Sequence, residues 1–97
     1  MASLEQFSET EYILKGDLIF SSCALIYEQS LHMFKKNTQY ININLQQVTR
    51  ADSSALALIV EWYRLSKKNN MQLKVTDMPK QMCDLAKLSS VDELLAE

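Results

Sequence analysis

The feature that most constrains the fold is a change of hydrophobic period across the middle of the chain. Residues 40–45, Tyr-Ile-Asn-Ile-Asn-Leu, alternate strictly, and so do residues 71–76, Met-Gln-Leu-Lys-Val-Thr. Alternation is typical of a β-strand, because successive side chains point to opposite faces of the sheet. Residues 53–69, between them, repeat apolar side chains at helical spacing. The centre of the chain therefore predicts strand, helix and strand, the alternation of an α/β domain.

The same periodicities predict further elements on both sides of this centre. They are two short strands and three helices, over residues 4–7, 11–15, 22–36, 79–88 and 90–95. Gly16-Asp17 is expected to end the second strand, and residues 46–52 are expected to form a loop. The order β-β-α-β-α-β-α-α predicts a single α/β domain over residues 1–97, with a small mixed four-stranded sheet and helices mainly on one side.

Two of the helices have an apolar stripe that we expect to face the core. Helical neighbours lie three or four residues apart, so the stripe is read from that spacing. The predicted core residues are Ala24, Tyr27, Leu31 and Phe34 in the helix that ends near Lys36, and Met82, Leu85, Ala86 and Leu88 in the helix over 79–88.

Composition and charge exclude several classes of protein. Apolar residues make up 47% of the chain and charged residues 23%, which is ordinary for a globular domain. The net charge is −2, with acids and bases interspersed, which argues against a nucleic-acid-binding surface or an anionic-membrane surface. The longest apolar run, Ala55 to Val60, is too short to span a membrane, and residues 1–7 lack the apolar run of a signal peptide. We therefore expect a cytoplasmic protein.

The chemistry-bearing residues do not form a recognisable catalytic or metal-binding pattern. Cys23 and Cys83 are far apart and not in a CxxC pair, which favours two free thiols in a reducing compartment. His32 is the single histidine and has no ligand-spaced partner. One glycine cannot make a GxGxxG loop, and Ser53 has no evident triad partner. The sequence predicts no enzyme, no cofactor and no metal.

The helix over residues 53–69 has more apolar surface than one core requires. One face holds Leu56, Ile59, Val60 and Tyr63, and an adjacent face holds Leu58, Trp62 and Leu65. The apolar arc is roughly 200° wide, against about 100° for an ordinary surface helix. One interpretation is that Leu58 and Trp62 are exposed and anchor a partner. The alternative is that this helix is central and flanked by the other two.

The start of this helix carries three consecutive capping residues, Asp52, Ser53 and Ser54. A helix N-terminus presents free N–H groups and a positive pole, so it attracts anions and acceptor groups. One reading is plain helix capping. The other is a contact or phosphorylation site at Ser53, although the neighbouring Asp52 would repel a phosphate dianion.

This region resembles the signature of STAS domains, the family of anti-sigma-factor antagonists and their relatives. The resemblance is carried by Asn44-Leu45, Val48 and residues 50–58, Arg-Ala-Asp-Ser-Ser-Ala-Leu-Ala-Leu. Residues 16–18, Gly-Asp-Leu, are similar to the Gly-Glu-Leu that follows the second strand in the family. The resemblance implies the STAS fold over nearly the whole chain. It also implies that Ser53 occupies the position that a kinase phosphorylates in the antagonists.

Within the family, the chain looks most like the STAS subunit of Mla-type phospholipid-transport ABC complexes. Arg50 before the Asp, the Leu-Ala-Leu of residues 56–58, and residues 85–88, Leu-Ala-Lys-Leu, carry this likeness. It implies a subunit that binds the ATPase subunit on the cytoplasmic side of the inner membrane and supports a transporter that maintains outer-membrane lipid asymmetry. The residues expected to contact this partner are Arg50, Asp52, Ser53, Ser54, Ala55, Leu58 and Trp62.

Two residues depart from the family pattern. Ala55 stands where the family often has glycine, and Ile19 stands where the antagonists have an acidic residue on the kinase-facing surface. The second departure weighs against a phosphorylation switch. The alternative function, an anti-sigma-factor antagonist regulated at Ser53, and a weak homodimer through the surplus apolar arc both stay open.

Overall fold

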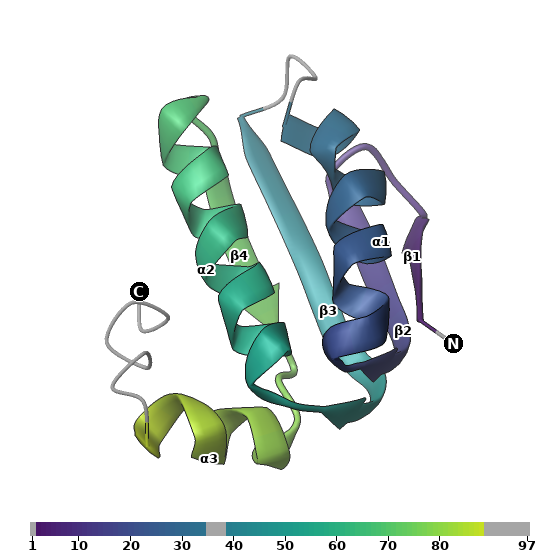
Figure 1. Ribbon diagram of the computed structural model, residues 1–97. Coiled ribbons are helices and arrows are strands. Elements are labelled where there is room, and N and C mark those ends of the chain that lie inside the picture. Colours follow the sequence, from purple (N-terminus) through teal and green to yellow (C-terminus); the bar gives the residue numbers. More distant parts are fainter. Residues whose placement is uncertain (1, 35–38, 89–97) are drawn as a thin grey trace.

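The computed structural model describes residues 2–34 and 39–88 (Figure 1). Its strands and helices, in chain order, are β1 (Ser3–Gln6), β2 (Glu11–Leu18), α1 (Phe20–Ser30) with a 3-10 turn η1 (Leu31–Phe34), β3 (Tyr40–Ala51), α2 (Ser53–Lys68), β4 (Gln72–Thr76) and α3 (Lys80–Leu88). The predicted α/β class is confirmed. The helix expected over residues 90–95 lies outside the described residues.

The strands form one mixed sheet in the order β1-β2-β3-β4. The β1–β2 pair is antiparallel, and the β2–β3 and β3–β4 pairs are parallel. Helices α1 and α2 lie side by side over one face of the sheet, and α3 lies across the end of the layer below α2 (Figure 1). Because β2 and β3 are parallel and each leads directly into a helix, α1 and α2 begin at the same edge of the sheet.

The alternation that predicted β3 divides its side chains between two faces. Ile41, Ile43 and Leu45 are fully buried under the helices. The opposite face carries Asn42, whose Nδ2 donates to Glu11 at 3.2 Å, and Asn44, whose Nδ2 donates to Asp77 at 2.7 Å. The sheet thus buries one apolar face, and polar side chains cover the other.

Strand bounds are where the sequence prediction is wrong. Gly16-Asp17 does not end β2, and residues 46–52 are not a loop, because β2 and β3 stay paired as far as Leu18 and Ala51. The register shifts twice along this stretch, and Gly16 takes a positive φ of 91°. A bulge adds a residue to one strand and breaks the period of two, so alternation does not reveal the continuing ladder.

The core face of α1 also differs from the prediction. The buried residues are Cys23, Ile26 and Ser30, whereas Ala24 is exposed and Tyr27 is only half-buried. Leu31 is half-buried too, and the side chain of Phe34 lies outside the described residues. Apolar residues occur on several sides of α1, and the stripe that faces the core contains a serine. Spacing alone therefore selected the wrong stripe.

The predicted core face of α3 is mostly confirmed. Met82 and Ala86 are buried, and Leu85 packs against the core while partly exposed. Leu88 is exposed, contrary to the prediction. At 3.6 residues per turn it lies about 200° around the helix from Ala86, so it points away from the sheet.

The chain itself covers most of both apolar faces of α2, and Val60, Tyr63 and Leu65 remain partly exposed. Trp62 is 0% exposed and Leu58 is 5% exposed, so the prediction that they form an exposed anchor is wrong. The Trp62 indole N–H donates to Ser30 Oγ at 2.7 Å, and that hydroxyl donates to the Tyr27 carbonyl oxygen, also at 2.7 Å. Helices α1 and α3 both contact α2, so the alternative of a central, flanked helix is the correct one.

Removing the Ser30 hydroxyl should destabilise the protein because the buried indole N–H loses its acceptor. We expect Ser30→Ala to lower the free energy of unfolding by about 1–3 kcal/mol. The same substitution in a Trp62→Phe background should cost less, and exposed Ser21→Ala should be nearly neutral. Denaturant unfolding of Ser30→Ala, Trp62→Phe, the double variant and Ser21→Ala gives the free energy of unfolding of each, and hence the energetic coupling between Ser30 and Trp62. An equal cost of Ser30→Ala in both backgrounds would contradict it.

Candidate partner-binding site

One carboxylate joins the starts of the two helices that cover the sheet. Asp52 Oδ1 accepts the Ser54 backbone N–H at 2.9 Å, which caps the first turn of α2. Its Oδ2 accepts the Phe20 backbone N–H, the first residue of α1, at 3.1 Å. Each helix N-terminus carries roughly half a positive charge, so one ionised carboxylate balances both. Asp52 thereby fixes α1 and α2 relative to each other at this edge.

The structure separates the seven sequence-predicted contact residues into two groups. Arg50 and Ser53 are exposed, and Asp52 and Ser54 are partly exposed, so these four lie at the surface around the start of α2. The other three are buried by their own chain; they are Ala55, Leu58 and Trp62.

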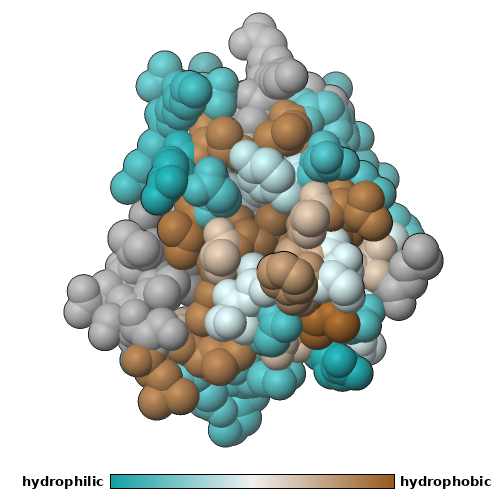
Figure 2. Space-filling model, in the orientation of Figure 1, coloured by the Kyte–Doolittle hydropathy of each residue, from teal (hydrophilic) through white to brown (hydrophobic). Residues whose placement is uncertain are grey.

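An apolar groove runs between α1 and α2 from this edge. Its volume is about 320 Å³, and it is lined by Phe20, Cys23, Ala24 and Tyr27 of α1 and by Ser54, Ala57, Leu58 and Glu61 of α2. Figure 2, in the orientation of Figure 1, shows hydrophobic residues gathered over the middle of this face, where the two helices lie side by side.

Helix α1 supplies the exposed apolar surface of this groove. Phe20 is 83% exposed, and Ala24 is exposed one turn further along. Sequence reasoning missed Phe20 because it precedes the predicted helix start. The stripe that we assigned to the core, Ala24, Tyr27 and Leu31, continues the line of Phe20 at helical spacing. The surplus apolar surface expected on α2 therefore lies on α1, and Leu58 contributes only to the floor beneath it.

The groove is nearly free of charge. Among the described residues that line it, Glu61 is the only charged one. Arg64 Nη1 donates to Glu61 Oε1 at 2.9 Å, with both side chains partly in solvent. Such an exposed pair contributes little to stability and leaves the carboxylate accessible to other donors.

The Cys23 thiol, on the groove floor, is held in its neutral form. Burial raises its pKa above the ordinary value of 9.0, and the nearby Asp52 carboxylate raises it further. A thiol acts as a nucleophile through its thiolate, so Cys23 is unsuited to that role at neutral pH.

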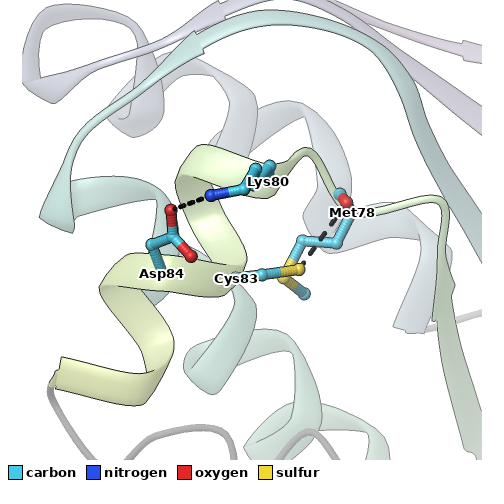
Figure 3. A network of polar contacts seen from close by, with 4 residues as sticks. All are labelled: Met78, Lys80, Cys83 and Asp84. Atoms are coloured by element: carbon cyan, nitrogen blue, oxygen red, sulfur yellow. Dashed lines mark hydrogen bonds and ion pairs between the residues drawn. The ribbon is translucent and has the colours of Figure 1, made fainter.

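The second cysteine, Cys83, lies on α3. Its thiol donates to the Met78 carbonyl oxygen at 3.7 Å, next to the Lys80–Asp84 ion pair (Figure 3).

The described residues include no candidate metal centre. They contain no group of three His, Cys, Asp or Glu side chains that could hold a metal ion. His32 is exposed, and its Nδ1 lies 2.6 Å from the Gln29 carbonyl oxygen. None of the helices in this part of the chain combines the length and apolar character needed to cross a bilayer.

A mixed sheet with helices over one face, and a helix that opens at Asp-Ser-Ser beside an apolar groove, defines a STAS-type domain. A family model described as "Mlab, STAS domain" matches residues 5–96. The chain therefore belongs to the MlaB-type STAS family. Among curated proteins, none matches it closely enough to count as a relative.

Solved structures of anti-sigma-factor antagonists share the fold. A putative antagonist from Thermotoga maritima superposes with a TM-score of 0.77 at 15% identity, over 97% of this chain and 82% of that one. SpoIIAA in its unphosphorylated form gives 0.74 at 14% identity, over 93% and 81% of the two chains. The Bacillus cell-fate determinant SpoIIAA in its phosphorylated form gives 0.71 at 17% identity, over 96% and 86%. At these identities the likeness establishes the fold alone.

Loss of the Asp52 carboxylate should weaken both helix starts. A lost cap typically costs about 1 kcal/mol, so we expect Asp52→Ala to lower the free energy of unfolding by about 2 kcal/mol. Asp52→Asn should cost about half as much, because the amide nitrogen cannot accept the second N–H. Denaturant melts give both values. Ser53→Ala is the control, since its exposed side chain should leave stability within about 0.5 kcal/mol of the parent. Equal stability of Asp52→Ala and Ser53→Ala would refute the double cap.

The raised pKa of Cys23 predicts slow alkylation. In a Cys83→Ser variant, the rate with iodoacetamide should be low at pH 7 and should rise with a midpoint above 9.0, because only the thiolate reacts. Mass spectrometry of timed samples gives the profile, with the denatured chain as the control. A midpoint at or below that of the denatured chain would contradict the assignment.

Proposed function

We propose that this chain is a non-catalytic accessory subunit that binds the ATPase of a phospholipid-transport ABC complex and supports the assembly or activity of that complex. It would act in the cytoplasm, on the inner membrane only through its partners, in a system that maintains outer-membrane lipid asymmetry. The observation that carries the proposal is the match of the MlaB-type family over residues 5–96. A protein of this type acts by docking, and the α1–α2 groove supplies a surface for it.

The proposed contact surface has a polar end and an apolar body. Around the start of α2, Ser53 and Arg50 are exposed and can bond directly to a partner. Beside them Phe20 stands 83% exposed, the kind of large aromatic side chain that anchors protein interfaces. Leu58 and Trp62 are buried beneath this surface, where they pack α2 against the rest of the chain. We therefore assign the predicted contact role to Phe20 and keep Leu58 and Trp62 as supporting residues.

A phosphorylation-regulated anti-sigma-factor antagonist is the second candidate. It is favoured by the exposure of Ser53 and by the fold shared with phosphorylated SpoIIAA. Against it, Asp52 already occupies the N–H groups of Phe20 and Ser54, so a phosphate on Ser53 would meet a carboxylate. The half-buried Ile19 also supplies no charge where the antagonists carry an acid.

Truncation of Phe20 should release the ATPase. We expect Phe20→Ala to reduce the ATPase recovered with the affinity-tagged chain by about tenfold or more, as the loss of an interface hot spot does. Phe7→Ala is the matched control, since Phe7 is also largely exposed but lies in the β1–β2 turn, away from the groove. Equal recovery with both variants would remove Phe20 from the interface. Absence of any ABC ATPase from the parent's partners would refute the proposal.

The mass of the native protein separates the two candidate functions. A transporter subunit should be recovered from its own cells without a phosphate on Ser53. A stoichiometric adduct that disappears in Ser53→Ala, together with recovery of a serine kinase, would favour the antagonist instead. Intact-mass spectrometry of the purified chain makes this measurement.

A further inference from the structure

The α1–α2 groove has the shape of a seat for one helix, and Glu61 is the one charged residue among the described residues that line it. We propose that its occupant is a single amphipathic helix of the partner protein, with a lysine or arginine facing Glu61. The inference rests on the proposed function in that it presupposes a docking protein, but it specifies which element of the partner binds and by what chemistry.

The geometry of the groove favours a helix over other elements. Helices α1 and α2 start at the same edge and lie side by side, so the channel between them runs along both (Figure 1). A third helix packs into such a channel when small side chains let the axes approach to about 8–10 Å. Ala24 and Ala57, both exposed, provide small side chains on opposite walls. A strand would find no free sheet edge here, because the backbone groups of helices bond internally.

The charges around the groove select a basic partner. Glu61 follows Ala57 by one turn of α2, and exposed Glu28 follows Ala24 by one turn of α1. Of these two residues, Glu61 lines the groove and Glu28 lies outside the lining. Among the described lining residues there is no lysine or arginine. Arg64, outside the lining, already bonds one oxygen of Glu61, so a cationic side chain of the partner helix would share this carboxylate with Arg64.

The arrangement predicts how the helix lies. A bulky apolar side chain would fill the space between Phe20 and the two alanines. A basic side chain three or four residues away, on the same face of the helix, would then reach Glu61. Ser54 offers a hydroxyl inside the groove at the opposite end, whereas Ser53 lies outside the lining.

Site-specific photocrosslinking tests the occupant. Benzoylphenylalanine replaces Phe20, which is 83% exposed and lines the groove, in the full chain, expressed in its own cells. This probe keeps the aromatic ring and leaves both alanines small, and the crosslinked peptide is mapped by mass spectrometry. The same probe at Lys74, exposed on β4, is the control. We expect the probe at residue 20 to label an amphipathic helix of another protein that has a lysine or arginine close to the labelled residue. The Lys74 probe should not label that helix.

Charge variants test the role of Glu61. We expect Glu61→Arg to lower the crosslinking yield from residue 20 about three- to tenfold, as lost electrostatic complementarity does. The double variant Glu61→Arg/Arg64→Glu should also bind weakly, although it keeps the net charge and allows the intrahelical pair. Glu9→Arg, an exposed acid in the β1–β2 turn, makes the same change of net charge away from the groove and should have no effect.

The outcomes separate this inference from the proposed function. An adduct with a second copy of this chain, with lipid, or with a loop or strand of the partner would overturn the helix seat, and so would the absence of any protein adduct. An unchanged yield in Glu61→Arg would overturn the charge assignment. A basic amphipathic helix from a protein other than an ABC ATPase would uphold the helix seat and refute the transporter role.

Discussion

The bridge made by Asp52 is the interaction on which the rest of the surface depends. Its two oxygens hold the first N–H of α1 and an N–H in the first turn of α2, at 3.1 and 2.9 Å. Because both helices follow parallel neighbouring strands, their positive N-terminal poles lie side by side at one end of the groove and would repel each other. The carboxylate balances that repulsion and sets the spacing of the helices. The groove is therefore a preformed feature of the free chain.

A second polar contact decides which apolar surface stays exposed. Ser30 is buried on the core side of α1, where its hydroxyl accepts the Trp62 indole N–H and so links α1 to α2. The residues of α1 that remain, Phe20 and Ala24 among them, then face outward. The width of the apolar arc suggested exposed apolar surface at Leu58 and Trp62 of α2, and this was wrong because the rest of the chain buries both residues. Arc width in one helix does not show which neighbouring helices cover it.

The parts of the fold that follow from a local rule were predictable. Alternation located β3 and β4, and the Asp-Ser-Ser cap located the start of α2. The continuation of β2 and β3 was not predictable, because the bulges near Gly16 disrupt the period on which such predictions depend. The polar end of the candidate site was visible as a motif. Its apolar body was not, since Phe20 precedes the predicted helix start and its backbone N–H meets Asp52 across 32 residues of sequence.

The exposure of Phe20 is the strongest physical argument that the surface has a use. Burying such a side chain stabilises a fold by about 1.5–3 kcal/mol, which is a large share of the stability of a small domain. A chain of 97 residues that leaves it in solvent forgoes that stabilisation in the free state. The same free energy becomes available when a partner covers the ring. Since Asp52 has already fixed the groove, little further ordering opposes that association.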